Sequence, residues 1–422
     1  MLGVSERIMY VFIWLKYCVK NILVKIYCLL CVRSKTFTTE CDIACLPEQV
    51  QYKRYSTCHI VYYDNGERRG YLRLCRVHEQ PRKYVDSIVC DYCEYAGIDE
   101  HRDELRRIIA DKLNDDSNLR KFFHMGVPFG RKYPKSATPY AKFLYTKDAS
   151  LIGLEGSLPE WFAPRLVNFA RFATFPIHDY QINAYLKEGQ YHTYFSGRTK
   201  AYEAVAELVG VSWIVPKSRY ICLNYGEKSR VGISIDVADG VPTDSLADIR
   251  ITPSFQRELS ILNMLDVICF QRDHKPDSYF VKTDKYGAVC GLSAFDNDEP
   301  GAFIAVPTIR FTGYDSQSPF VDRAGHINRP YLDSDISLHI MSITPEDLHN
   351  ALSPYISGIE VMMCAVRLKR LTKAVKKSVE AGTTKLLGYD EWTYETIAKE
   401  LNGKYGMTYL KCFVEKYKAR TV

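Results

Sequence analysis

The order of elements between Pro253 and Asp298 constrains the fold more than any other feature of the sequence. Apolar residues recur every three or four positions after Pro253, which predicts an amphipathic helix. A charged loop follows at 271–278, and two predicted strands, the second at 288–294, then lead into the acidic segment 295–298. This order predicts an α+β fold. The chain is 46% hydrophobic and 25% charged, which excludes a wholly disordered, collagen-like or coiled-coil protein.

The charged loop and the acidic segment contain the residue types that phosphoryl transfer needs. This reaction uses a carboxylate to orient the acceptor hydroxyl, a cation near the transferred phosphate, and oxygen ligands that hold Mg²⁺ against the nucleotide. Asp273 is the candidate for the first role and Lys275 for the second. Asp296 and Asp298 are candidate metal ligands. We expect the hairpin between the charged loop and the acidic segment to fix the spacing of the two carboxylate groups that these motifs carry.

This region resembles the protein-kinase-like superfamily, with HipA-like bacterial kinases and phosphoinositide-kinase-like proteins as the nearest setting. Arg-Asp-His-Lys-Pro-Asp-Ser at 272–278 is similar to the catalytic loop Arg-Asp-Leu-Lys-Pro-Glu-Asn, and Phe-Asp-Asn at 295–297 stands where Asp-Phe-Gly begins with its metal-binding Asp. The resemblance implies a two-lobed fold, with a mixed β-sheet small lobe at 165–252 and a mainly helical large lobe at 253–422. It also implies an ATP-dependent, Mg²⁺-dependent phosphotransferase, with Ser or Thr of a protein substrate as the expected acceptor.

The match to the small lobe of such kinases is less complete. In these enzymes a strand Lys holds the nucleotide phosphates and pairs with a Glu of the following helix. We expect that helix at 199–209, with Glu203 or Glu207 as the partner, but the preceding strand at 191–196 contains no Lys. Three basic residues are candidates for the missing charge, with Lys200 preferred over Arg198 and Lys187. The sequence Ser-Gly-Arg-Thr at 196–199 is either an anion-binding helix N-terminus or a simple cap.

Ser278 is a second departure, because these kinases have a metal-binding Asn at this position. A hydroxyl can ligate Mg²⁺, so Ser278 stays a candidate ligand beside Asp296. We interpret His274 as a loop residue and not as a ligand. The two departures leave open an alternative function, that of a catalytically inactive pseudokinase that binds a nucleotide or a partner.

The rest of the chain is predicted to form an extra N-terminal α+β module with its linker at 36–150, and further elements within the lobes. The module has a β-hairpin at 52–76, turned at Asp64-Asn65-Gly66, and a helix at 99–113, followed by a basic Pro/Gly-rich linker at 125–147. The lobes have a hairpin at 180–195, strands near 215–223 and 231–237, and a helix at 359–379. Residues between the apolar positions of that last helix are predicted to form a solvated basic face: Arg367, Lys369, Arg370, Lys373, Lys376 and Lys377.

The net charge of +6 is too small to indicate a nucleic-acid partner, but its distribution is uneven. Residues 1–35 contain six basic side chains and one acidic side chain, so nearly all of the excess lies there. The apolar stretch 8–32 is interrupted by three Lys, which disfavours a clean membrane-spanning helix. It is a helix packed on the protein, an amphipathic helix on an anionic membrane, or a marginal signal anchor. We expect a cytoplasmic protein, with membrane association through 8–32 left open.

Cysteines are concentrated at the N-terminal end, where nine of the 14 lie in the first 93 residues. Cys28 and Cys31, followed by Cys41 and Cys45, have a spacing compatible with a tetrahedral zinc site. The first pair lies inside an apolar run and not in a Gly-rich knuckle. The favoured interpretation is therefore that these are thiols in a reducing compartment.

Overall fold

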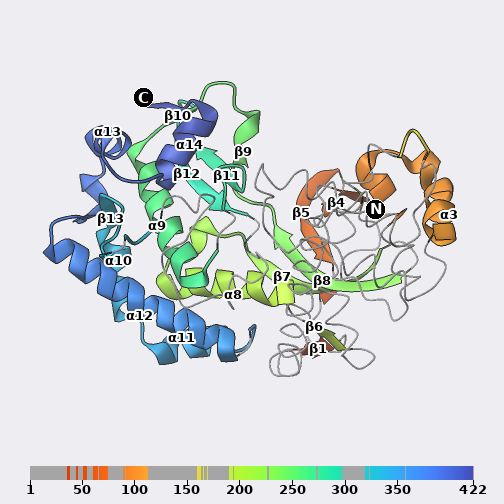
Figure 1. Cartoon of the computed structure of the whole chain (residues 1–422), viewed down its shortest axis with the longest axis horizontal. Coiled ribbons are helices and arrows are strands. Elements are labelled where there is room, and N and C mark those ends of the chain that lie inside the picture. Colours follow the sequence, from red (N-terminus) through yellow and green to blue (C-terminus); the bar gives the residue numbers. More distant parts are fainter. Residues whose placement is uncertain are drawn as a thin grey trace, which may run out of the picture. The chain divides into compact units, whose positions relative to one another are not determined.

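The computed structural model describes residues 36–38, 44–45, 51–54, 60–64, 66–74, 89–90, 92–112, 159–162, 165, 169, 190–192, 194–225, 228–271, 274–295, 297, 319–322, 324–356 and 358–421. The chain divides into two compact units, one made of Met1–His192 and Tyr220–Ile233, the other of Thr193–Arg219 and Ser234–Val422. Helices and several sheets occur together (Figure 1), so the predicted α+β class is confirmed. The range 165–252, predicted as a small lobe, is divided between the two units.

The first unit contains a six-stranded sheet in the order β2-β7-β8-β5-β4-β3. Its strands are β2 (Ala44–Cys45), β3 (Gln51–Arg54), β4 (Ile60–Asp64), β5 (Glu67–Leu74), β7 (Ser218–Tyr225) and β8 (Lys228–Asp236). β4 and β5 pair antiparallel with Ile60 opposite Leu72, and Gly66 takes a φ of 81° in the turn between them. The predicted hairpin at 52–76 is therefore confirmed, as are the strands predicted near 215–223 and 231–237.

Two further predictions fall in the first unit. The helix predicted at 99–113 is confirmed as a 3₁₀ turn at Asp99–His101 followed by α3 (Arg102–Lys112). The strand β6 (Gln190–His192) pairs antiparallel with β1 (Thr36–Thr38). The first half of the hairpin predicted at 180–195 lies outside the described residues, and so does the predicted linker at 125–147.

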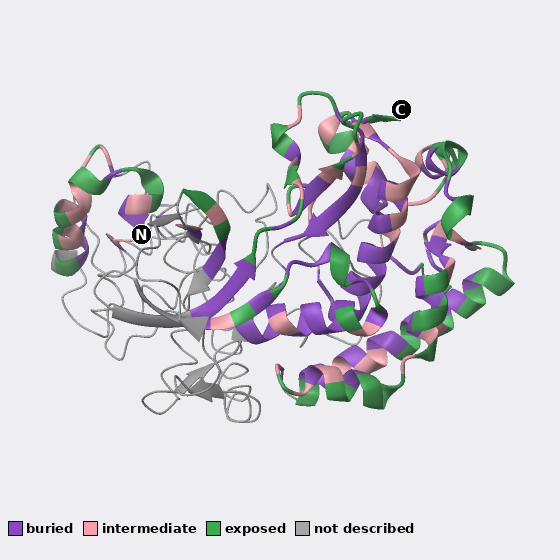
Figure 2. Ribbon diagram, turned by 180° about the vertical axis from the view of Figure 1, so that it is seen from behind, coloured by how far each residue is buried: buried purple, intermediate pink, exposed green. Residues whose placement is uncertain are grey.

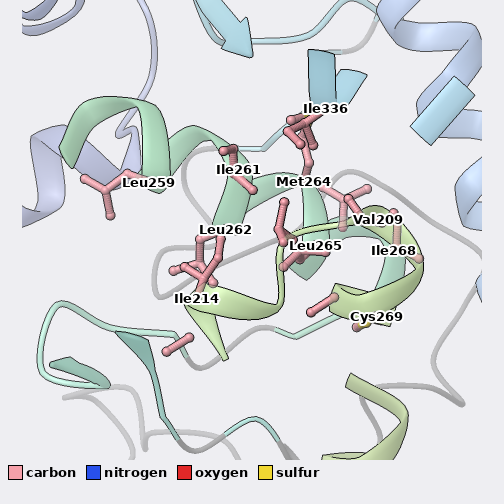
Figure 3. Packing of buried hydrophobic residues seen from close by; sticks show 14 of the residues in the cluster. Val209, Ile214, Leu259, Ile261, Leu262, Met264, Leu265, Ile268, Cys269 and Ile336 are labelled. Atoms are coloured by element: carbon pink, nitrogen blue, oxygen red, sulfur yellow. The ribbon is translucent and has the colours of Figure 1, made fainter. Parts of the chain in front are cut away.

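The second unit is built around α9 (Pro253–Cys269), which is buried over most of its length (Figure 2). The helix begins where the Thr252 side chain accepts a hydrogen bond from Phe255 N, with Pro253 in the first turn. It ends at Phe270, whose φ of 58° places it in the left-handed region. A helix with apolar residues on every side belongs in the interior. Figure 3 shows Leu259, Leu262 and Leu265 of α9 among the buried side chains of the core.

Helices and strands from the rest of the second unit pack around α9. The other helices described in this unit are α8 (Tyr194–Val209), α10 (Ser334–Ser342), α11 (Pro345–Leu352), α12 (Gly358–Glu380), α13 (Tyr394–Asn402) and α14 (Tyr409–Tyr417). Short 3₁₀ turns lie at Ser212–Ile214, Thr243–Ser245 and Tyr389–Glu391. A five-stranded sheet has the order β15-β10-β12-β11-β9, and a second sheet pairs β13 parallel to β14. These strands are β9 (Val241–Pro242), β10 (Arg250–Ile251), β11 (Tyr279–Thr283), β12 (Val289–Ala294), β13 (Tyr331–Asp333), β14 (Lys385–Leu387) and β15 (Arg420–Thr421).

Helix α8 begins at Tyr194, five residues before the predicted start at Thr199. The sequence Ser-Gly-Arg-Thr at 196–199 therefore lies within the helix and does not precede it. Ser196, Arg198 and Thr199 are buried there, and Arg198 donates to Glu360 on α12. The expected anion-binding or capping role at 196–199 as the helix N-terminus is wrong. The predicted strand 191–196 is likewise replaced by β6 and the first residues of α8.

The helix predicted at 359–379 is confirmed as α12, but one residue of its predicted basic face is not solvated. Lys369, Arg370 and Lys373 are exposed, as expected. Arg367 is buried, and its guanidinium donates a hydrogen bond to Ile268 O within the second unit. Within the part of the chain that the structure describes, no helix is both long enough and apolar enough to cross a membrane. Residues 8–32 lie outside that part.

Candidate functional site

The hairpin β11–β12 brings the two predicted motifs to the same end of the sheet. Tyr279 at the start of β11 lies opposite Ala294 at the end of β12. Beyond this pair, Phe295 N donates a hydrogen bond to Ser278 O at 2.8 Å. The loop before β11 and the segment after β12 are therefore held side by side. The spacing of the two carboxylate groups, which this hairpin was expected to fix, stays a prediction because Asp273 and Asp296 lie outside the described residues.

A tight turn at the other end of the hairpin sets its register. Asp284 Oδ1 accepts hydrogen bonds from Tyr286 N and Ala288 N, both at 2.9 Å. Gly287 takes a φ of 75°, a conformation that Gly adopts without steric cost. An Asp followed by a Gly in this arrangement is a common turn signal, and it makes the pairing of β11 with β12 a local property of the sequence.

His274 connects the two motifs directly through its side chain. Its Nε2 lies 2.8 Å from Asn297 Oδ1, and its Nδ1 lies 2.8 Å and 2.9 Å from the two carboxylate oxygens of Asp266 on α9. The ring of His274 and the carboxylate of Asp266 are completely buried. His274 lies in the loop before β11, as predicted, and its buried ring links this loop to α9 and to the acidic segment.

The direction of these hydrogen bonds follows from Asn297. Its Nδ2 donates to Ala294 O at 3.2 Å, so its Oδ1 faces His274 and accepts from Nε2. The other ring nitrogen, Nδ1, faces the Asp266 carboxylate. Both ring nitrogens therefore face hydrogen-bond acceptors. Removing one of these partners would leave a buried polar group unsatisfied, which costs about 1–3 kcal/mol.

Two tyrosines complete the surroundings of Asp266. Tyr202 on α8 donates its hydroxyl to Oδ1 at 2.6 Å, and Tyr409 on α14 donates to Oδ2 at 2.5 Å. Burial raises the pKa of both tyrosine hydroxyls well above the usual value, and the Asp266 charge raises it further, so both remain donors. We call these residues the Asp266 network: Tyr202, Asp266, His274, Asn297 and Tyr409.

Lys275 and Ser278, two of the predicted site residues, close the loop that follows His274. Ser278 N donates to Lys275 O at 2.8 Å, and Lys275 N donates to Ser278 Oγ at 3.3 Å. Asp277 pairs with Lys416 on α14 at 3.0 Å. Partial burial raises the pKa of Asp277, but the hydrogen bond from Lys416 and its charge outweigh burial, so the net shift is downward. The loop is thus held by its own turn and by one ion pair.

Lys200 and Glu203, predicted to bind phosphate and to pair with the phosphate-binding cation, contact each other on α8. Lys200 Nζ lies 2.8 Å from Glu203 Oε2 and donates to Ser218 O at 2.7 Å. Glu203 Oε2 also accepts from Ser218 N at 3.0 Å. The resemblance implies a strand Lys paired with a helix Glu, and this pair differs from that arrangement because both residues lie on α8.

Arg198, the second candidate for phosphate binding, lies in the interior of the second unit. It is 1% exposed, and its Nε and Nη2 donate to Glu360 Oε1 on α12 at 3.2 Å and 3.0 Å. The guanidinium therefore links α8 to α12. The remaining predicted site residues, Lys187, Asp273, Asp296 and Asp298, lie outside the described residues. Cys28, Cys31 and Cys41, whose spacing is compatible with zinc but which are interpreted as thiols, lie outside them as well. Among the described residues, no group of three or more His, Cys, Asp or Glu side chains is placed to hold a metal ion.

Sequence reasoning did not find Asp266, Tyr202, Tyr409 or Asn297. One signal was available, since Asp266 is a charged residue between Leu265 and Val267 in a helix that is otherwise apolar there. A carboxylate in such a position needs buried donors. No protein-family model matches this sequence, and no curated protein matches it.

Proposed function

We propose that this protein is an ATP-dependent phosphotransferase with a protein-kinase-like catalytic arrangement. The observation that supports the proposal most strongly is the contact of His274 with Asn297 at 2.8 Å. In the sequence, His274 follows Asp273, and Asn297 stands between Asp296 and Asp298. Phosphoryl transfer requires a carboxylate that orients the acceptor and carboxylates that bind metal in one place. The buried contact between His274 and Asn297, which are the sequence neighbours of these carboxylates, supports the proposal that the carboxylates lie close together.

The roles in this proposal follow the residue chemistry. Asp273 would orient the acceptor hydroxyl and take its proton, and Lys275 would stabilise the charge that develops on the transferred phosphate. Asp296, with Ser278 or Asp298, offers the hard oxygen ligands that Mg²⁺ prefers. When bound, ATP would supply the phosphoryl group, and Mg²⁺ would neutralise part of its charge. Lys200 would contact the nucleotide phosphates, with Glu203 holding its side chain. Protein Ser or Thr is the proposed acceptor.

A second candidate function is that of a catalytically inactive nucleotide- or partner-binding protein. Two observations favour it. The hydrogen bonds of Lys200 to Glu203 and Ser218 would have to be exchanged for phosphate contacts, and the hydroxyl of Ser278 accepts from Lys275 N within the loop. Membrane association through residues 8–32 is compatible with either function and rests on the sequence alone.

The experiment that separates the two functions measures Mg²⁺-dependent ATP consumption and self-labelling by the full-length protein. We expect Asp273→Asn and Asp296→Asn each to lower both rates by about 100-fold or more, the usual contribution of a general base or a metal ligand. Asp239→Asn is the matched control, because this carboxylate is 79% exposed and pairs with Lys282. The control should stay within about twofold of wild type.

The possible results assign the function. Unchanged labelling in both variants would leave a phosphotransferase whose catalytic residues lie elsewhere. Absence of labelling with every divalent metal, together with a thermal shift on adding ATP, would support the binding protein. Absence of both labelling and thermal shift would contradict the proposed enzyme.

A further inference from the structure

Four elements meet at the Asp266 carboxylate: α8, α9, α14 and the loop before β11. Tyr202 belongs to α8, Asp266 to α9, and His274 to the loop before β11. Their side chains form an unbroken chain of hydrogen bonds from Tyr202 through Asp266 and His274 to Asn297, with lengths of 2.6 Å to 2.9 Å. Helix α8 also carries Lys200, two residues before Tyr202. The network therefore connects the helix of the proposed phosphate-binding residue to both predicted motifs.

We infer that Asp266 is a positioning residue, which through Tyr202 and His274 fixes helix α8 relative to the catalytic loop and the metal-binding segment. The catalytic consequence of this inference rests on the proposed function. Its structural content, that one carboxylate sets the relative placement of three elements, does not.

The geometry at Asp266 leaves the carboxylate little freedom. Tyr202 donates to Oδ1, Tyr409 donates to Oδ2, and His274 Nδ1 lies within 2.9 Å of both oxygens. Rotation of the carboxylate about its last bond would break contacts with at least two elements at once. A fully satisfied buried polar network of this kind gives a unique arrangement, which an apolar residue of similar volume would not specify.

The network contains a matched pair of donors that makes the inference testable. Tyr202 and Tyr409 are both buried, and each donates one hydroxyl to the same carboxylate. Only Tyr202 connects Asp266 to α8, because Tyr409 belongs to α14. Replacing either by Phe removes one oxygen atom and keeps the ring, so the variants should fold. Asp266→Asn is the more direct change, but it risks unfolding the unit.

We expect Tyr202→Phe and Tyr409→Phe to lower thermal stability by similar amounts and to differ in their kinetics. Tyr202→Phe should lower kcat about 10-fold to 100-fold, because the hydrogen bond that positions α8 relative to the loop is worth about as much as one hydrogen bond to a charged group. It should also raise KM for ATP, since Lys200 lies on the released helix. Tyr409→Phe should lower kcat by a smaller factor, about threefold at most. Equal kinetic losses in the two variants would overturn the inference.

Hydrogen exchange provides a readout that does not depend on activity. We expect amides of α8 to exchange about tenfold faster in Tyr202→Phe than in Tyr409→Phe. His274→Gln should accelerate exchange of the Phe295 amide, whose hydrogen bond to Ser278 O holds the two motifs together, and of the Ser278 amide, whose hydrogen bond to Lys275 O closes the loop. If wild type lacks phosphotransfer, the proposed function fails while these exchange rates still decide the inference. Identical exchange in wild type, Tyr202→Phe and His274→Gln would overturn it.

Discussion

The guanidinium of Arg198 and the carboxylate of Glu360 form an ion pair that is almost completely removed from water. The two side chains are 1% and 3% exposed, and the closest atoms, Arg198 Nη2 and Glu360 Oε1, are 3.0 Å apart. A pair in this environment contributes little net stability, because desolvation offsets most of the attraction. Its effect is different when one partner is lost, since the other charge then stays buried alone. The residues therefore act as a unit that holds α8 against α12.

Single substitutions of this pair should be far more damaging than the double substitution. We expect Arg198→Met and Glu360→Leu each to lower the free energy of unfolding by about 3–5 kcal/mol, whereas the double variant should lose much less than the sum. Urea denaturation of the four proteins gives the interaction energy. Additive losses would contradict the assignment. A retained thermal shift with ATP in the double variant would separate the role of Arg198 in stability from the predicted role in phosphate binding.

Among the elements, α9 depends on a residue from another helix at its C-terminal end. The last carbonyl groups of a helix have no partner within the helix. Arg367 on α12 donates its Nε to Ile268 O in the last turn of α9 at 2.8 Å, and its guanidinium lies 5.5 Å from the ring of Phe270. The loop with the proposed catalytic residue follows directly. Arg367 thus stabilises the end of α9 from which the site begins.

Removal of the Arg367 side-chain donor should destabilise the second unit. We expect Arg367→Met to lower the free energy of unfolding by about 2 kcal/mol, the value of a hydrogen bond from a charged donor to an otherwise unpaired carbonyl. Arg370→Met is the matched control, because Arg370 lies on the same helix and is exposed. The control should change stability by less than about 0.5 kcal/mol. Equal losses in chemical denaturation would show that Arg367 acts only through general helix propensity.

Elements with local signals could be predicted from the sequence, and contacts between distant residues could not. The apolar spacing after Pro253 predicted α9, and the strand predicted at 288–294 is β12. The burial of Arg367 could not be read from α12 alone, because its acceptor Ile268 is 99 positions away. The same limit applies to the site. Tyr202 and Tyr409 reach Asp266 from 64 and 143 positions away, so periodicity within any one helix contains no information about them.

Over the whole molecule, two buried glutamates make the stability of the second unit sensitive to pH. Glu258 on α9 accepts a hydrogen bond from Leu292 N at 2.6 Å, and Glu400 on α13 accepts from Gln256 Nε2 at 2.6 Å. Burial raises the pKa of both carboxyl groups, and the hydrogen bonds only partly oppose this shift. The folded chain therefore binds these protons more tightly than the unfolded chain, in which a Glu titrates at about 4.3.

The sign of the resulting pH dependence can be tested with one isosteric variant. Below about pH 4.3 Glu258 is protonated in both the folded and the unfolded chain, so no buried carboxyl group has to ionise. As the pH rises from there through the raised pKa, the free energy of unfolding falls. Glu258→Gln keeps an acceptor for Leu292 N and removes this loss, so its unfolding free energy should fall less than that of wild type between pH 4.3 and neutrality. Glu391→Gln is the control of opposite sign, because hydrogen bonds from Gly388 and Lys385 lower the pKa of this exposed carboxyl group. Urea denaturation between pH 4.3 and neutrality measures the slope due to Glu258, and denaturation below about pH 4.3, where a lowered pKa makes stability fall with decreasing pH, measures the slope due to Glu391. A Glu258→Gln slope equal to that of wild type would show that the Glu258 carboxylate is as well solvated in the folded chain as in the unfolded chain.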